Sequence, residues 1–346
     1  MILTLHPFDL YLRHAFTISR ESRTVQRTLI VALSDGVHTG YGEATANPHY
    51  YGVSIEGMVE VLTQLKPVVE SAVIETPEAF WAQMEPHLRE HPFALCALDV
   101  AANDLFARQR GLPLYKYWGL NLNHLPMSNY TIGIASIEEM AAKMEEQPWP
   151  LYKIKLGTAN DLEIIRELRS HTDAVFRVDA NCAWTPEQTI AFAPELKALG
   201  VEFIEQPLKA EDWEGMREVY AHSALPVIAD ESCRVETDVD RCQGYFHGIN
   251  IKLMKCGGLT PARRMITRAR QLGLKVMVGC MTESSVGISA IAQLLPLLDY
   301  VDMDGAILLR EDIATGVNLS DGKAHFPDLP GTGVVLIGDN RNTGSI

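Results

Sequence analysis

The sequence predicts an α/β protein whose main part is a closed (β/α) barrel, preceded by a smaller α+β module. From residue 130 onward, short apolar runs recur at near-regular intervals, and helix-like segments such as DLEIIRELRSH and TPARRMITRARQLG separate most of them. This alternation is typical of parallel βαβ units, and eight such runs favour a closed barrel. An open doubly wound sheet is the alternative, but its usual GxGxxG signature is missing.

Each of the eight runs has the length and composition of a strand buried in a sheet. They are YTIGIA at 130, YKIKLG at 152, VFRVDAN at 175, FIEQP at 203, VIADES at 227, INIKLMK at 249, KVMVGC at 275 and YVDMDG at 300. The C-terminal ends of the strands form the active face of such a barrel. Polar residues at these ends are therefore the first candidates for function.

The chain before the barrel has a different pattern. TLIVALSDGVHTGYGEA predicts a β-hairpin, and residues 55–110 predict helices. The tail, with Gly, Pro and Asp in short runs, is expected to return to this first module. We therefore expect an α+β capping domain at 1–124, the barrel at 125–310 and a C-terminal return at 311–346.

Composition and charge exclude several classes of function. The chain has 346 residues and a net charge of −14, so neither nucleic acid nor an anionic membrane, which require basic patches, is expected as its main partner. No apolar run approaches the roughly 20 residues of a membrane span, and we expect no secretion signal. The six cysteines form no CxxC pair, which is typical of reduced thiols in a cytoplasmic protein.

Three carboxylates stand at the C-terminal ends of three successive predicted strands: Asp179, Glu205 and Asp230. A single carboxylate there is as well explained by a loop cap or a surface ion pair. Three that converge on one spot need a cation, because like charges at short distance repel. With oxygen ligands only, we expect one Mg²⁺ per subunit, with Mn²⁺ able to substitute.

Lysines lie on both sides of these carboxylates along the chain. Lys153 and Lys155 are two residues apart in one strand, so they point to one face, although burying two ammonium groups is unfavourable. Lys252 lies inside the apolar run INIKLMK. Lys255 is the competing candidate, but it adjoins a Gly-Gly turn, where we expect an exposed lysine. The alternative role for Lys252 is a buried ion pair, with Glu231 as the candidate partner.

The order and spacing of these motifs resemble the enolase superfamily, in the subgroup typified by muconate-lactonizing enzymes, over nearly the whole chain. The motifs are KIK at 153–155, VDAN at 178–181, IEQP at 204–207, ADES at 229–232 and NIKL at 250–253. The resemblance implies a modified TIM barrel with a capping domain that the C-terminal tail completes. It also implies that Asp179, Glu205 and Asp230 bind Mg²⁺ and that Lys155 and Lys252 are the acid/base groups.

The same resemblance implies supporting roles for three further residues. Asn181 and Glu231 would support the metal ligands, and Lys153 would help to hold a substrate carboxylate and lower the pKa of its neighbouring lysine. Such a site removes a hydrogen α to a carboxylate, while the metal offsets the charge that develops. One lysine on each face of the planar intermediate permits racemisation or epimerisation. A β-elimination or cycloisomerisation needs only one lysine as base.

The last predicted strand carries a pair of carboxylates away from the metal ligands. Asp302 and Asp304, in YVDMDG, share one face at the active end, which favours a cation such as a substrate ammonium. Ion pairs with lysines or arginines of the barrel are the alternative. This Asp-x-Asp is similar to the pattern of dipeptide epimerases, in which it binds the N-terminal ammonium.

The segment FTISRESRT, which we expect to be a mobile loop, supplies Arg20 and Arg23. It resembles the loop of L-Ala-D/L-Glu epimerases in which an arginine matching Arg23 pairs with the glutamate carboxylate, for which guanidinium geometry is suited. Its acidic neighbour Glu21 is expected to face the other way, and a solvated loop charge is the alternative. By the same resemblance, Thr131 and Cys280 would contact the dipeptide backbone.

These expectations favour an epimerase that interconverts L-Ala-L-Glu and L-Ala-D-Glu in the metabolism of cell-wall (murein) peptides. The alternatives within the subgroup are o-succinylbenzoate synthase, N-acylamino acid racemase and muconate cycloisomerase. A non-catalytic barrel that only binds metal and ligand is disfavoured, because both lysines and all three carboxylates are present. Barrels of this kind often associate, so a homo-oligomer is also expected.

Overall fold

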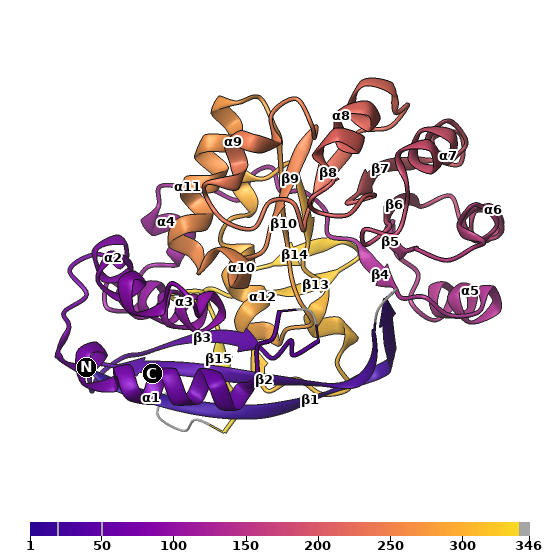
Figure 1. Ribbon diagram of the computed structural model, residues 1–346. Coiled ribbons are helices and arrows are strands. Elements are labelled where there is room, and N and C mark those ends of the chain that lie inside the picture. The colour runs from indigo at the N-terminus through magenta and orange to yellow at the C-terminus, as the bar shows by residue number, and fades with distance from the viewer. Residues whose placement is uncertain (19–20, 50, 339–346) are drawn as a thin grey trace.

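The computed structural model describes residues 1–18, 21–49 and 51–338 of the chain. These residues form a barrel of parallel strands, against which an antiparallel sheet and helices from the N-terminal part are packed (Figure 1). Among the described helices, none is both long enough and apolar enough to cross a membrane.

All eight predicted barrel strands form one parallel sheet in chain order. They are β4 (Tyr130–Ile132), β5 (Leu151–Lys155), β6 (Val175–Asp179), β7 (Val201–Glu205), β8 (Val227–Ala229), β9 (Gly248–Ile251), β10 (Lys275–Gly279) and β11 (Tyr300–Asp302). An isolated parallel bridge between Ser128 and Val301 joins the two edges, so the barrel is nearly closed. The predicted (β/α) barrel is thus confirmed.

Helices connect successive strands and cover the outside of the barrel (Figure 1). They are α5 (Ile137–Glu146), α6 (Asp161–His171), α7 (Pro186–Ala198), α8 (Trp213–His222), α9 (Asp238–Cys242), α10 (Leu253–Cys256), α11 (Leu259–Gln271) and α12 (Ser285–Ala292), with the 3₁₀ turns η1 (Leu295–Leu297) and η2 (Gly305–Leu308). Local sequence determines where several begin. Ser136 and Thr185 start α5 and α7 in capping boxes, which satisfy the free N–H groups of the first turn.

The N-terminal part combines an antiparallel sheet with helices, as predicted. Its elements are β1 (Ile2–Ile18), β2 (Glu21–Ser34), β3 (Thr39–Thr45), α1 (Ile55–Ser71), α2 (Pro77–Leu88), α3 (Pro92–Arg108) and α4 (Leu114–Tyr117). Helix α3 lies directly against β3. A Cβ atom at Gly42 would lie 2.0 Å from the carbonyl oxygen of Ala97, so glycine is required for this close approach.

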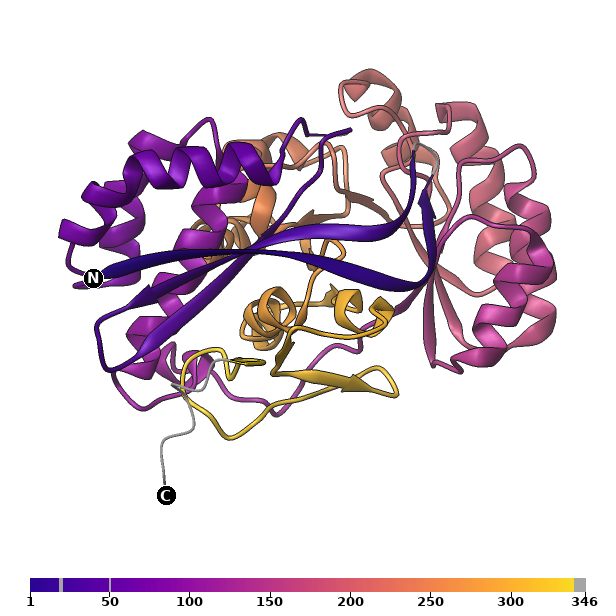
Figure 2. The same ribbon diagram turned by 90° about the horizontal axis from the view of Figure 1, so that it is seen from below.

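The long hairpin of β1 and β2 crosses the molecule in front of the barrel (Figure 2). Near its tip, the N–H of Ile134, just after β4, donates to the carbonyl of Thr17 at 2.9 Å. Farther back, the N–H of Arg310 donates to the carbonyl of Tyr11 at 2.7 Å. These two anchors hold the described part of the hairpin around Thr17 beside the C-terminal ends of the barrel strands.

The C-terminal segment packs on the N-terminal sheet. It contains two short antiparallel pairs, β12 (Ala314–Thr315) with β15 (Val335–Leu336) and β13 (Asn318–Ser320) with β14 (Lys323–His325). A small core is shared by this segment and the sheet, and it includes Ile30, Ala32, Tyr41, Ala314, Val334 and Leu336. The domain boundaries at residues 124 and 310 remain a prediction.

The interface between the N-terminal sheet and the barrel buries two carboxyl groups. Glu43 on β3 accepts hydrogen bonds from the N–H groups of Ser284 and Gly287, at 3.0 and 2.9 Å, at the start of α12. Glu283 accepts one from the N–H of Met281 at 2.7 Å. Burial raises the pKa of Glu43, and burial together with the charge of Glu43 raises the pKa of Glu283 to about 8.

We expect Glu283 to make the folded protein less stable as the pH rises toward 8. A carboxyl group whose pKa is raised by folding stabilises fully below its unfolded pKa, about 4.3, and this contribution is lost as pH passes the folded pKa. In the wild type the free energy of unfolding should therefore fall as the pH rises toward 8. Glu283→Gln should make this fall smaller by about 1 to 3 kcal/mol, at about 1.4 kcal/mol per pKa unit. Urea unfolding at pH 6 and pH 8.5 measures this.

The matched control for this prediction is Glu56→Gln. Glu56 has a side chain that is 68% exposed, and it pairs with Arg27 away from this interface. This control should keep the pH dependence of the wild type. If Glu283→Gln also has the pH dependence of the wild type, Glu283 does not hold a proton in the folded protein at neutral pH.

Candidate active site

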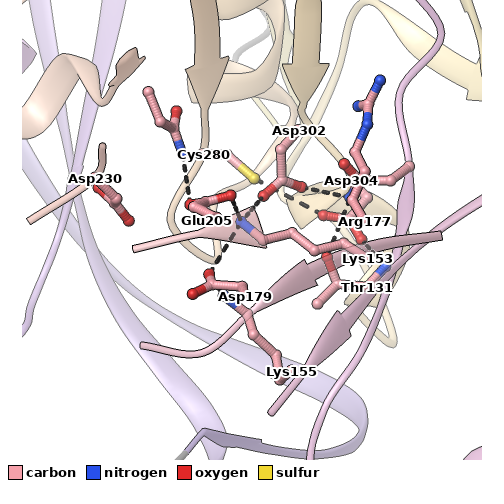
Figure 3. A network of polar contacts seen from close by, with 12 residues as sticks. Thr131, Lys153, Lys155, Arg177, Asp179, Glu205, Asp230, Cys280, Asp302 and Asp304 are labelled. Carbon is pink, nitrogen blue, oxygen red and sulfur yellow. Dashed lines mark hydrogen bonds and ion pairs between the residues drawn. The ribbon is translucent and has the colours of Figure 1, made fainter. Parts of the chain in front are cut away.

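The structure brings Asp179, Glu205 and Asp230 together, and we call these three residues the carboxylate triad (Figure 3). Asp179 and Glu205 are the last residues of β6 and β7, and Asp230 directly follows β8. One oxygen of each lies within 4.8 Å of the others, and all three side chains are buried. Buried carboxylates this close repel one another unless positive charge compensates them.

Lys155 and Lys252 contact opposite ends of the triad. Lys155, the last residue of β5, places Nζ 2.7 Å from Oδ2 of Asp179. Lys252, directly after β9, places Nζ 3.0 Å from Oδ2 of Asp230. The strands β6, β7 and β8 lie between β5 and β9 in the barrel, and both lysines line the same cavity. They therefore reach this cavity from opposite walls.

Lys153 is surrounded by carboxylates (Figure 3). Its Nζ lies 2.8 Å from Glu205, 2.9 Å from Asp302 and 3.2 Å from Asp179. Burial would lower the pKa of Lys153, but these carboxylates outweigh burial and hold that pKa well above its ordinary value. This explains how two lysines can share one buried face. The predicted contact of Lys153 with a substrate carboxylate remains a prediction.

The expectation that Lys255 is exposed is wrong. Its side chain is buried, and its Nζ donates to Oδ1 of Asp230 and, at 2.7 Å, to the carbonyl oxygen of the same residue. The short helix α10 follows Lys252, and residues three apart in a helix lie on the same side. Lys255 is thereby turned back toward the triad. Asp230, and not Glu231, is the ion-pair partner of Lys252.

Two amides that the sequence analysis did not identify position the triad. Asn250 Nδ2 donates to Oε1 of Glu205 at 2.8 Å, and Gln206 Oε1 accepts the N–H of Asp230 at 2.9 Å. Gln206 has a φ of 34°, in the left-handed region that side chains disfavour. Asn250 lies two residues before Lys252, so strand alternation places both on one face. That spacing could have identified Asn250 from the sequence.

Asp302 is bound on two sides at the end of β11. It accepts a hydrogen bond from Asn129 Nδ2 at 2.7 Å and one from Lys153 Nζ at 2.9 Å. Burial would raise the pKa of Asp302, but the positive charges of Lys153 and Lys155 hold it below its usual range. The alternative role predicted for Asp302 and Asp304 is an ion pair with a barrel lysine or arginine. Asp302 does form such an ion pair, with Lys153.

Asp304 is in a different situation from Asp302. It accepts the N–H of Thr131 at 2.6 Å, and Cys280 Sγ lies 3.9 Å from its other oxygen (Figure 3). Burial and the nearby charge of Asp302 raise the pKa of Asp304 to about 8. The described residues provide it with no ion pair to lysine or arginine. Thr131, Cys280 and both aspartates line the cavity, so a cationic group of a ligand can reach them.

Asn181 and Glu231 line the cavity beside the triad. The N–H of Asn181 donates to Oδ1 of Asp179 at 2.9 Å, from a residue with a φ of 45°. Burial and the charge of Asp230 raise the pKa of Glu231 to about 7. Its Oε2 is buried without a hydrogen-bond partner among the described residues.

Arg23 lies in the strand β2 and not in a mobile loop, while Arg20 lies outside the described residues. Nη1 of Arg23 is 2.5 Å from Oε1 of Glu21, so the expectation that Glu21 faces away is wrong. Residues i and i+2 of a strand point to the same side, which accounts for the pair. Arg23 Nη2 also donates to Thr282 Oγ1 at 3.1 Å, and all three residues line the cavity.

One cavity of about 430 Å³ connects these groups. Its wall includes Asp230 of the triad and the two lysines Lys155 and Lys252. Glu21 and Arg23 line it on the side of the hairpin. Sites of roughly 300 to 1,000 Å³ are typical of small-molecule ligands. The cavity is therefore of the size expected for a small substrate.

The residues present fit a hard divalent cation. The triad offers only oxygen ligands, which Mg²⁺ prefers, and the unpaired oxygen of Glu231 adjoins Asp230 along the chain. Cys280, Asp302 and Asp304 form a second group with the spacing of metal ligands. That group includes the thiol of Cys280, which a hard cation does not prefer, so the triad with its oxygen ligands only is the better site for Mg²⁺.

The fold and the site together define an enolase-like barrel, in which a carboxylate triad lies between two lysines beneath an N-terminal cap. Residues 135–340 match the family described as enolase C-terminal domain-like, and residues 5–119 match the mandelate racemase / muconate lactonizing enzyme N-terminal domain. The chain therefore belongs to the mandelate racemase / muconate lactonizing enzyme family of the enolase superfamily. The resemblance stated from the motifs is confirmed.

Individual relatives extend this similarity over nearly the whole chain. The chain is 58% identical over 337 residues to the L-Ala-D/L-amino acid epimerase of Flavobacterium johnsoniae, covering 97% of this chain and 100% of that one. A substrate-liganded L-Ala-D/L-Glu epimerase from Bacillus subtilis gives a TM-score of 0.92 at 28% identity, covering 97% and 98%. The dipeptide epimerase of Cytophaga hutchinsonii, complexed with Mg and D-Ala-L-Val, gives 0.90 at 26%, covering 98% and 97%.

Proposed function

We propose that this chain is a Mg²⁺-dependent dipeptide epimerase, an isomerase that inverts the α-carbon next to the C-terminal carboxylate of its substrate. The observation that carries the proposal is the placement of Lys155 and Lys252 on opposite walls of one cavity, on either side of the triad. Inversion by proton transfer needs one group on each face of the α-carbon. The site supplies both groups.

The proton transfers are the work of the two lysines. One removes the α-hydrogen, and the other returns a hydrogen to the opposite face. Mg²⁺ held by the triad would supply the positive charge that offsets the charge developing on the substrate carboxylate. Burial would lower the pKa of Lys252, but Asp230 holds that pKa above its ordinary value. A cation held by the triad would offset the charge of Asp230, and burial of Lys252 would then favour the neutral amine that a base requires.

The substrate class follows from the other end of the cavity. With the carboxylate at the triad, Asp302 and Asp304 would receive an N-terminal ammonium, and Thr131 and Cys280 would contact the dipeptide backbone; all four line the cavity. An acylated amine or a substrate without nitrogen would offer Asp302 and Asp304 no cation, so this pair of buried carboxyl groups would have no role in binding it. This disfavours the alternatives o-succinylbenzoate synthase, N-acylamino acid racemase and muconate cycloisomerase.

The proposed substrates are L-Ala-Xaa dipeptides, with L-Ala-L-Glu and L-Ala-D-Glu of murein peptides among them. The relative that is 58% identical is named for L-Ala-D/L-amino acid rather than for glutamate alone, which supports a range of second residues. Arg23 on the hairpin lines the cavity and would meet an acidic side chain. Arg23 is paired with Glu21, so a substrate glutamate would have to compete with Glu21 for this arginine.

A dipeptide library incubated with the wild-type protein and Mg²⁺ in D₂O tests the proposal. Epimerisation through proton transfer incorporates deuterium at the α-carbon of the second residue, which mass spectrometry detects. We expect incorporation into L-Ala-Xaa dipeptides and much less into N-acetyl amino acids. Incorporation into N-acetyl amino acids alone, or into no dipeptide, contradicts the proposal.

Asp304→Asn should lower kcat/KM on every dipeptide with a free amino terminus. Losing one partner of a buried charge pair costs about 2 to 5 kcal/mol, so the loss should be about 30-fold or more. An asparagine oxygen can still accept the N–H of Thr131. The comparison is between L-Ala-L-Glu and its N-acetyl derivative, which lacks the ammonium and should lose much less. Equal losses on the two would indicate that Asp304 only supports the fold.

Four further points belong to the proposal. We propose that Mn²⁺ substitutes for Mg²⁺, because both accept oxygen ligands. A cytoplasmic location is proposed from the cysteine pattern. A homo-oligomeric state is proposed because barrels of this kind often associate. The division of the chain at residues 124 and 310 is proposed from the change of sequence pattern at these positions.

A further inference from the structure

The cavity wall holds an ion pair that the proton transfers do not use. Glu21 and Arg23 both belong to β2 and both line the cavity, with Nη1 of Arg23 2.5 Å from Oε1 of Glu21. Their side chains are only 15% and 20% exposed, so water screens the pair weakly. The charge of Arg23 is therefore balanced within the chain.

Two further contacts hold the Arg23 guanidinium in place. Thr282, on the segment after β10, accepts a hydrogen bond from Nη2 at 3.1 Å. Phe16 lies opposite Arg23 in the register of β1 and β2, and the guanidinium carbon is 5.6 Å from the centre of its ring. Cation–π attraction favours this distance. The pair is thus fixed by the hairpin and by the barrel together.

The placement of the other groups in the cavity makes this pair a candidate contact for the substrate side chain. The triad and the two lysines occupy the region of the carboxylate and α-carbon, and Asp302 and Asp304 occupy the region of the ammonium. The lining that remains includes the hairpin wall with Glu21 and Arg23, and we assign this wall to the side chain of the second residue. This step rests on the proposed function.

We propose that Glu21 determines the range of substrate side chains by neutralising Arg23. A shielded arginine without a partner would attract acidic side chains and penalise apolar and cationic ones. A balanced pair adds no net charge that an apolar side chain would have to cover, and it offers a carboxylate to a cationic side chain. An acidic side chain must compete with Glu21 for Arg23. The pair therefore converts a glutamate-selective wall into a tolerant one.

Glu21→Gln tests the proposal with substrates of matched shape. We measure kcat/KM on L-Ala-L-Glu, L-Ala-L-Gln and L-Ala-L-Lys. The ratio of the Glu to the Gln substrate should rise about 10- to 100-fold in the variant, the range expected when one charge-assisted hydrogen bond is released for the substrate. Activity on L-Ala-L-Lys should fall. Arg23→Met should move the ratio in the opposite direction, because Glu21 then repels the acidic substrate.

Glu56→Gln is the control, because it releases Arg27 on the same strand at an exposed site. It should leave all three ratios unchanged. If Glu21→Gln does not fold, Glu21→Ala replaces it, with thermal unfolding to confirm the fold. An unchanged Glu-to-Gln ratio in a folded Glu21 variant overturns this inference, while the proposed function stands. A wild type that epimerises no dipeptide overturns both.

Discussion

Lys252→Ala should abolish epimerisation in both directions, while one epimer still exchanges its α-hydrogen with solvent. In the proposed mechanism inversion uses both lysines, so kcat should fall by about 10²- to 10⁴-fold, the range typical of a lost general acid or base. Lys155 remains on the opposite wall and can still remove and return a hydrogen on its own side. By the family resemblance, Lys155 would act on the D centre, so the D epimer should exchange. NMR of each epimer in D₂O measures this.

Lys155→Ala is the mirror experiment, in which the L epimer alone should exchange. The two lysines make similar contacts with the triad, at 2.7 and 3.0 Å, so their removal disturbs its charge to a similar extent. General damage to the site would slow exchange of both epimers alike. Only a base on each face predicts opposite losses in the two variants. Interconversion near the wild-type rate in either variant would remove that lysine from the mechanism.

Lys255 would then be the next candidate, and its surroundings allow it to be tested separately. Its side chain is fully buried, whereas that of Lys252 is 13% exposed and lines the cavity. Lys255 bonds to both the side chain and the backbone of Asp230. Lys255→Met should therefore impair stability or cation binding, and it should slow the exchange of both epimers together.

The barrel was predictable because local signals and topology agree at each of its strands. A parallel strand covered on both faces is a short continuous apolar run, and its polar C-terminal residue marks the active end. Asp179 and Glu205 show both signals at once, which is why the triad could be predicted from strand ends alone. The helix from 161 to 171 was equally clear, since its apolar residues recur with helical spacing.

The details of the site that could not be predicted depend on contacts between distant segments. Arg23 bonds to Thr282, 259 residues away, through a hairpin whose path across the barrel leaves no local signal. Lys255 appeared exposed beside its glycines, because nothing in the nearby sequence shows that α10 turns it toward Asp230. The pairing of Glu21 with Arg23 is different. Strand alternation predicts it as soon as the segment is recognised as a strand.

Removal of divalent cations should abolish activity, because without a cation the triad cannot offset charge on the substrate carboxylate. In the structure the triad is balanced by Lys153, Lys155 and other lysines. A lysine that acts as a base must first lose its proton and its positive charge. The lysines alone therefore cannot both transfer protons and offset the negative charge of the triad and the substrate carboxylate. Excess EDTA should therefore stop epimerisation, and added Mg²⁺ should restore it. Full activity in excess EDTA would end the metal-assisted interpretation.

Asp230→Asn should weaken Mg²⁺ binding measured by calorimetry without substrate, so that the result does not depend on catalysis. Mutation of groups that merely support metal ligands costs about 10- to 100-fold in affinity, so loss of a charged ligand should cost at least as much. The control is Asp240→Asn, whose aspartate is 56% exposed and pairs with Arg268 outside the site. Asp230→Asn also leaves Lys252 and Lys255 without their shared partner, so thermal unfolding must show that the variant is folded. A folded variant that binds Mg²⁺ as tightly as the wild type would show that Asp230 serves the lysines and not the cation.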